Sequence, residues 1–251
     1  MRLLFSSAVI GALLAGSQMA EAQSRADLIE AFSGDWFIFD SARGTGSSAC
    51  QLSLGTQPTA EDGPMPLSQR HCTAPLTDVA VWDVQQGQLV FVDEAGTPLA
   101  QLGGNQRRLT GNLAPDGEGV VVERANGDGS NLEIAQAVQK YRCFFLGVSS
   151  DCASEEDLKA PEFPQEAEQQ TASIETLGNV VARSQPRRDS SQVGTIPGNT
   201  CIQVDQCLVA SDGLWCRAGF GDTTAWIARN AVRQGEWPII TFRSDCTQDN
   251  E

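Results

Sequence analysis

The sequence predicts an all-β protein, and two observations support this. Short apolar runs with a period of two recur along the first half of the chain, and Gly, Pro, Asn and Asp turns separate them. These runs follow one another closely with no helical crossover pattern between them, which favours an antiparallel barrel or sandwich over a parallel sheet. The 251 residues, 41% hydrophobic and 20% charged, are enough for two modest globular domains.

The individual strands follow from the alternation of apolar and polar side chains. Residues 89–92 form a continuous apolar run between two turns, which is typical of a buried strand between hairpins. The predicted strands of the first half are residues 36–38, 50–54, 80–84, 89–92, 107–111 and 119–123. The stretch 64–75 is interpreted as a loop.

A short helix is expected after these strands. Ser130 and Glu133 have the spacing of a capping box, and Ile134, Val138 and Tyr141 then fall on one helical face. The helix would lead into a loop that begins at a cysteine.

An acidic segment separates this helix from the C-terminal part. Residues 151–170 contain six Glu or Asp side chains between Glu155 and Glu168, against a single Lys159, and also two prolines. This composition predicts a solvated linker, because a charge run is usually a soluble spacer. The alternative interpretation is an acidic docking tail.

The first residues have the pattern of an export signal. Arg2 supplies a positive charge, residues 3–15 are apolar, and the Ala-Glu-Ala of residues 20–22 fits a cleavage site. We therefore expect a mature chain that begins at Gln23, in the periplasm or secreted. No cysteine precedes Cys50, so a lipoprotein is not expected, and no later stretch approaches the roughly 20 apolar residues of a membrane span.

Charge and motif content argue against two classes of function. A net charge of −15 would repel a phosphate backbone, so nucleic acid is not expected as a partner. The single histidine, His71, lies beside Cys72, and the sequence has neither a Gly-x-Ser-x-Gly nor a His-Glu-x-x-His motif. We therefore expect no enzyme, no metal site and no cofactor. A hydrolase with two distant carboxylates leaves no local signature and ranks last.

Eight cysteines in an exported chain predict disulfides rather than a metal site, since their spacing contains no Cys-x-x-Cys pair. Export places the chain in an oxidising compartment, where an even number of cysteines is typical of a disulfide framework. Locality predicts Cys143 with Cys152 and Cys207 with Cys216, and Cys201 is left for Cys246 if Cys50 pairs with Cys72.

A series of motifs in the first half carries a resemblance to a known family. The motifs are Gly34-Asp35-Trp36, Cys50-Gln51-Leu52-Ser53-Leu54, His71-Cys72, Ala80-Val81-Trp82, the run 87–93 and the run 96–100. In their order and spacing they resemble the bacterial alkaline proteinase inhibitor family, over roughly residues 27–125. The resemblance implies an antiparallel barrel of about eight strands, a disulfide between Cys50 and Cys72, and a secreted zinc metallopeptidase of the serralysin type as partner.

The same resemblance implies an inhibitory segment at the mature N-terminus. In that family an N-terminal trunk enters the protease cleft, and its backbone and terminal amine approach the catalytic zinc. The corresponding residues are Gln23, Ser24, Arg25, Ala26 and Asp27, followed by a helical or extended connection over residues 28–32. Five extended residues span at most about 17 Å. The alternative interpretation is a frayed terminus without a role.

The C-terminal part carries a second resemblance. Short β-rich runs at residues 178–183, 193–196, 201–204, 212–217 and 224–228 alternate with Gly, Pro and Asp turns. They resemble a bacterial SH3-like domain, a small five-stranded barrel, and Trp215 and Trp226 are large enough to organise its core. The two side chains are a possible ligand groove, with Trp237 as a further candidate, although tryptophans in so small a barrel are more often core.

The predicted organisation is a signal peptide (1–22), an inhibitor-type barrel (23–125), a helix, disulfide loop and acidic linker (126–170), an SH3-like domain (171–240) and a tail (241–251). The predicted function is inhibition of a zinc metallopeptidase through the trunk. The alternative is a periplasmic binding or adaptor module that recognises cell-wall fragments or an envelope protein through the SH3-like domain.

Overall fold

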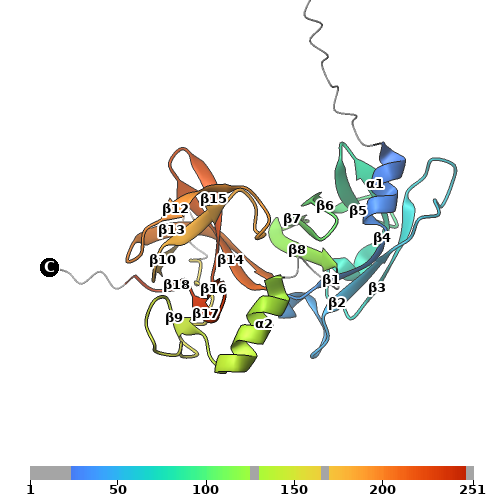
Figure 1. Cartoon of the computed structure of the whole chain (residues 1–251). Helices are drawn as coiled ribbons and strands as arrows, with labels where there is room; N and C mark the ends of the chain where they lie inside the picture. The colour runs from blue at the N-terminus through green and yellow to red at the C-terminus, as the bar shows by residue number, and fades with distance from the viewer. Residues whose placement is uncertain (1–23, 125–129, 165–169, 247–251) are drawn as a thin grey trace, which may run out of the picture.

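Eight antiparallel strands form a closed barrel in the first half of the chain, as predicted (Figure 1). The computed structural model describes residues 24–124, 130–164 and 170–246. Each barrel strand pairs with the next along the chain, and β1 closes the barrel by pairing with β8. The strands are β1 (Gly34–Ile38), β2 (Cys50–Leu54), β3 (Met65–Arg70), β4 (Val79–Gln85), β5 (Gln88–Asp93), β6 (Pro98–Gly104), β7 (Arg108–Leu113) and β8 (Glu118–Arg124).

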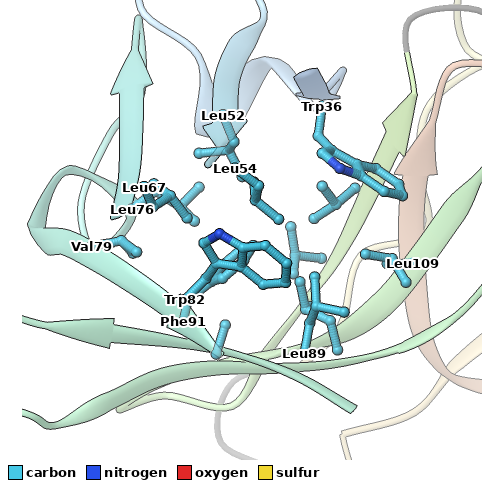
Figure 2. Packing of buried hydrophobic residues seen from close by; sticks show 14 of the residues in the cluster. Trp36, Leu52, Leu54, Leu67, Leu76, Val79, Trp82, Leu89, Phe91 and Leu109 are labelled. Carbon is cyan, nitrogen blue, oxygen red and sulfur yellow. The ribbon is translucent and has the colours of Figure 1, made fainter. Parts of the chain in front are cut away.

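The interior of the barrel is filled by the inward side chains of these strands. Figure 2 shows Trp36, Trp82 and Phe91 among the aliphatic residues that surround them. Both indoles are fully buried, and each indole N–H donates to a backbone carbonyl, Trp36 to Phe32 (2.7 Å) and Trp82 to Gly55 (3.0 Å). Burial of the rings therefore leaves no indole donor without a partner.

Helix α1 (Arg25–Phe32) lies against this barrel beside β4 (Figure 1). Phe32 is buried in the barrel core, and Leu28 and Ile29 pack against that core from the same helix. Two short 3₁₀ turns, at Ser41–Arg43 and Leu76–Asp78, lie in the connections between strands.

The interpretation of residues 64–75 as a loop was wrong, because β3 occupies Met65–Arg70. Met65 and Leu67 point into the core while Pro66 and Ser68 stay exposed, so the period of two is present. Only two apolar side chains face inward, and the proline between them is unusual in a paired strand. Pairing with β2 and β4 on both sides stabilises this weak segment.

The second half of the chain forms two further sheets. A seven-stranded sheet has the order β12-β11-β15-β14-β13-β10-β18, and a three-stranded sheet has the order β16-β17-β9 with β9 parallel to β17. The elements are α2 (Ser130–Tyr141), β9 (Phe145–Leu146), β10 (Ala172–Thr176), β11 (Val180–Arg183), β12 (Gln192–Ile196), β13 (Cys201–Ala210), β14 (Gly213–Phe220), β15 (Thr223–Ala228), β16 (Asn230–Arg233), β17 (Trp237–Ile240) and β18 (Phe242–Arg243). A five-stranded SH3-like barrel within this unit stays a prediction.

The acidic segment does not run free of the C-terminal unit where the structure describes it. Its Glu155, Glu156 and Glu162 side chains are exposed, but Pro161 is buried and Phe163 packs against the core of the seven-stranded sheet. Because α2 and β9 also pack on β17, residues 130–164 belong structurally to the C-terminal unit.

The two units pack together through β8 of the barrel and β13 of the C-terminal sheet. Val121 of β8 is buried among Leu208 and Trp215. A side chain at Gly119 would collide with Leu208, since an added Cβ would lie 2.3 Å from its methyl group. The barrel and the sheet therefore meet at a close-packed interface.

Candidate functional site

The N-terminal end of α1 is formed by a capping box. The Asp27 amide donates to Ser24 Oγ (3.2 Å), and the Ser24 amide donates to Asp27 Oδ2 (3.0 Å). These bonds satisfy amides that have no partner within the helix. Hydrogen bonds from the Ser24 side chain and then from its backbone hold the pKa of Asp27 below its usual range. Ser24, Ala26 and Asp27 are exposed.

Arg25 attaches the first turn of α1 to the barrel. Its Nη2 and Nε lie 2.7 and 3.0 Å from Oδ1 of Asp83 on β4, and Nη2 also donates to the carbonyl of Gly63 (2.9 Å). The ion pair is partly exposed, with side-chain exposures of 38% for Arg25 and 21% for Asp83. The helix therefore begins at a fixed place beside β4 and the connection from β2 to β3.

Arg124 of β8 holds the opposite end of α1. Its Nη1 donates to the carbonyl of Ser33 and its Nη2 to that of Ala31, both at 2.7 Å. The guanidinium carbon lies 4.4 Å from the ring centroid of Trp36. Partial burial lowers the pKa of Arg124 from its ordinary value. A cation here complements the negative end of the helix dipole.

A groove of about 360 Å³ separates α1 from the turn between β6 and β7. Leu28 and Phe32 line its helix side, and Asn105 and Arg107 line the turn. Asn105 also donates to Asp189 Oδ2 of the C-terminal unit (3.2 Å), so the second unit reaches the rim of this groove.

A buried cluster of charges joins the barrel to the C-terminal unit. Arg108 of β7 donates to Glu123 Oε1 of β8 (2.7 Å) and to Asp212 Oδ1 (2.8 Å), and the three side chains are at most 1% exposed. Nε of Arg188, which is partly exposed, lies 2.9 Å from Asp212 Oδ2. The buried Arg108, Glu123 and Asp212 are thus balanced by one another and by the partly exposed Arg188, as buried charges require.

The structure places the predicted trunk partly in α1. Gln23 lies outside the described residues, Ser24 is the N-cap, and Arg25, Ala26 and Asp27 form the first helical turn. Residues 28–32, expected as a helical or extended connection, are the rest of the helix. Of the described trunk residues, Arg25, Ala26 and Asp27 are therefore helical, Ser24 caps the helix, and Arg25 attaches this turn to the barrel, where an extended segment was expected.

The predicted groove tryptophans have different environments. Trp215 is 1% exposed and donates from Nε1 to Asp212 Oδ1 (3.0 Å), so it belongs to the interface between the units and does not line an open groove. Trp226 is half-buried, with the Arg217 guanidinium 5.9 Å from its ring. Trp237 stacks on Tyr141 at 4.6 Å.

The eight cysteines form four disulfides, which are the predicted pairs. They are Cys50 with Cys72, Cys143 with Cys152, Cys201 with Cys246, and Cys207 with Cys216. His71 is exposed beside the first of these bridges.

Sequence reasoning missed the residues that hold α1 and join the units. Arg108 and Glu123 are opposite charges on two predicted strands joined by a tight turn, and they form a cross-strand pair. That pattern was a usable signal. Asp83, Arg124 and Asp212 are far in sequence from their partners and offered no local signal.

The described residues contain neither a metal-binding cluster nor a membrane-spanning helix. Over residues 24–124, 130–164 and 170–246, no three His, Cys, Asp or Glu side chains gather in a way that could hold a metal ion. Within the same ranges, no helix combines the length and apolar character needed to cross a membrane.

Comparison with known proteins addresses the barrel half of the chain. No curated protein matches this sequence. A family model does match, over residues 28–124, which run from the second turn of α1 to the end of β8. The family is described as protease inhibitor Inh, so the barrel with its attached helix is similar to protease inhibitors.

Proposed function

We propose that this protein inhibits a zinc metallopeptidase of the serralysin type through its N-terminal residues. The observation that carries the proposal is the match of residues 28–124 to a protease inhibitor family, over the same barrel that the motifs predicted. The resemblance implies that residues directly before this region enter the protease cleft. In this chain those residues are Gln23 and the first turn of α1.

The first turn can leave the barrel at low cost. Ser24, Ala26 and Asp27 are exposed, and the contact that ties this turn to β4 is the Arg25–Asp83 pair. A partly exposed ion pair of this kind contributes about 0.2–1 kcal/mol, and the hydrogen bond from Arg25 to the Gly63 carbonyl adds about 0.5–1.5 kcal/mol. Nanomolar binding corresponds to about 12 kcal/mol. Uncoiling of residues 24–27 on binding is therefore compatible with tight inhibition.

The decisive experiment compares two forms of the mature protein against a serralysin-type metallopeptidase. One form begins at Gln23 and the other at Leu28. We expect nanomolar inhibition by the first, a loss of at least about a hundredfold in the second, and nearly unchanged thermal unfolding. The variant Asp83→Asn, with the full N-terminus, is the matched control: it weakens the Arg25–Asp83 pair from the barrel side without changing a trunk residue, and it should inhibit because the released turn is still present.

Two other outcomes would contradict the proposal in part or in full. Equal inhibition by both forms would place the inhibitory surface on the barrel and not on the trunk. Absence of inhibition by either form, across several such proteases, would refute the proposal. It would favour the alternative function, in which the C-terminal unit binds cell-wall fragments or an envelope protein.

Export of the chain is part of this proposal, because a secreted protease is met outside the cytoplasm. Residues 1–23, which include the predicted signal, lie outside the described residues. Mass spectrometry of the protein recovered from the periplasm or medium should show a chain that begins at Gln23. Recovery of the uncleaved chain from the cytoplasm would contradict export.

A further inference from the structure

The last strand of the barrel contacts both α1 and the C-terminal unit. Val121 and Glu123 of β8 face the C-terminal unit, whereas Val122 faces the barrel core and Arg124 reaches α1. This arrangement follows from the alternation of side chains along a strand. Glu123 and Arg124 are thus adjacent residues of one strand, with different neighbours.

The turn between β13 and β14 determines the environment of Glu123. The Ser211 amide donates to Glu123 Oε2 (2.7 Å), and the Ser211 hydroxyl donates to Oε1 (2.6 Å). Arg108, which also binds Glu123, is itself bound by Asp212 of the same turn. The carboxylate is fully buried, so its orientation depends on residues that the C-terminal unit supplies.

Arg124 is equally constrained on the other side of the strand. It donates to two carbonyls at the end of α1 and lies over Trp36. The backbone amide of Arg124 also donates to the carbonyl of Arg107 (2.9 Å), next to Arg108 in β7. The position of the end of β8 therefore sets the position of the guanidinium, and the guanidinium sets the position of the end of α1.

We propose that the C-terminal unit positions the N-terminal helix: the Ser211–Asp212 turn fixes Glu123 and Arg108, and the end of β8 thereby holds Arg124 against α1. Glu123 and Arg124 are positioning residues. Each contact in this series involves the same residue as the next contact or a residue adjacent to it, from the Ser211–Asp212 turn to α1. The predicted effect on inhibition rests on the proposed function, whereas the effect of the C-terminal unit on the position of α1 does not. The inference gives residues 130–246 a task that the inhibitor-type region does not explain.

The test is hydrogen exchange of the full mature chain, read separately for α1 and for β4–β5. Ser211→Ala and Asp212→Asn weaken the turn, while Arg124→Ala removes the contact with α1 and Arg124→Lys restores one donor. Asp205→Asn is the matched control, since it breaks an exposed ion pair with Arg217 (2.8 Å) in the same unit. Inhibition constants are measured for every variant.

We expect exchange of α1 amides to quicken about 2- to 30-fold in the Ser211, Asp212 and Arg124→Ala variants, with little change in β4–β5. Arg124→Lys should recover part of the protection, and Asp205→Asn should match the wild type. Inhibition should weaken in the same order as α1 protection is lost. Ser211→Ala keeps the test valid if Asp212→Asn fails to fold.

Two results would overturn the proposal in whole or in part. One is α1 exchange at the wild-type rate in both turn variants, which would mean that the units are joined without any effect on the helix. The other is faster α1 exchange with undiminished inhibition, which would keep the positioning of α1 and overturn the inhibitory consequence drawn from it. If the wild-type chain inhibits no protease, the proposed function fails, and the exchange data still decide whether the C-terminal unit holds α1.

Discussion

Glu123 shows how much one side chain depends on the rest of this fold. Its carboxylate is fully buried, and it accepts hydrogen bonds from Arg108 on the neighbouring strand and from Ser211 of the other unit. A buried carboxylate is stabilised only while such partners compensate for its lost hydration. Replacement by a neutral group leaves the positive charge of Arg108 with less compensation.

We therefore predict that Glu123→Gln lowers the free energy of unfolding by about 3–5 kcal/mol, the cost of removing one partner from a buried ion pair. Urea denaturation of the mature chain measures this directly. Asp205→Asn, at an exposed ion pair, is the control and should change stability by no more than about 0.5 kcal/mol. Equal losses of unfolding free energy in the two variants would show that the buried cluster stabilises the fold no more than an exposed ion pair does.

Asp27 provides a pH-dependent prediction at the start of α1. The Ser24 hydrogen bonds lower its pKa in the folded protein below the ordinary value of 3.8, so folding favours the ionised carboxylate. The contribution of the capping box is therefore present above pH 3.8 and is lost as pH falls through the lower, folded pKa.

An NMR titration of the Asp27 and Leu28 amides from pH 6 down to about pH 2 should show the first turn of α1 loosening below pH 3.8. Asp27→Asn should remove this titration. A transition of the same size and midpoint in the Asn variant would assign the effect to another carboxyl group.

At the scale of elements, α1 is a short helix that depends on contacts at both ends. Isolated helices shorter than about 12–15 residues are marginal in water, and this one has eight. The capping box begins it, Arg25 attaches it to Asp83, and Arg124 binds its last carbonyls. The sequence indicated a connection here, but it gave no sign of Arg124, because that residue comes from the last strand of the barrel.

The disulfide between Cys50 and Cys72 joins β2 to the residues just after β3 across a separation of 22 residues. We predict that replacing both cysteines by alanine costs about 2–5 kcal/mol. The same change at Cys143 and Cys152, with a separation of 9, should cost about 0.8 kcal/mol less from chain entropy alone. Chemical denaturation of both double variants measures the difference, and an unchanged midpoint for the first would contradict the prediction.

At the scale of the whole molecule, the interface makes the two units interdependent. Val121 and Trp215 supply its apolar part, and Arg108 is buried against Asp212. A barrel without residues 130–246 would expose these groups to water. The acidic composition of residues 151–170 predicted a solvated linker and left open whether the two units pack together. In the structure Phe163 packs against the core of the C-terminal sheet, and the units meet through β8.

We therefore predict a single cooperative unfolding transition for the mature chain, and a lower unfolding midpoint for a fragment of residues 23–124. Differential scanning calorimetry of both proteins tests this, with the calorimetric and van't Hoff enthalpies compared for the full chain. Two separate transitions, one of them at the midpoint of the fragment, would mean that the units unfold independently.

The sequence by itself determined the β class, most barrel strands and the Cys143–Cys152 and Cys207–Cys216 pairs, because strand periodicity and short cysteine spacings are local properties. The Cys50–Cys72 pair came from the family resemblance, and the Cys201–Cys246 pair was what remained. Only the tertiary structure decided that Trp215 is buried between the units, that β3 is a strand, and that Arg108 meets Asp212. These two residues are separated by 104 positions. Their contact depends on how one sheet docks on another, and no local pattern of residues encodes that geometry.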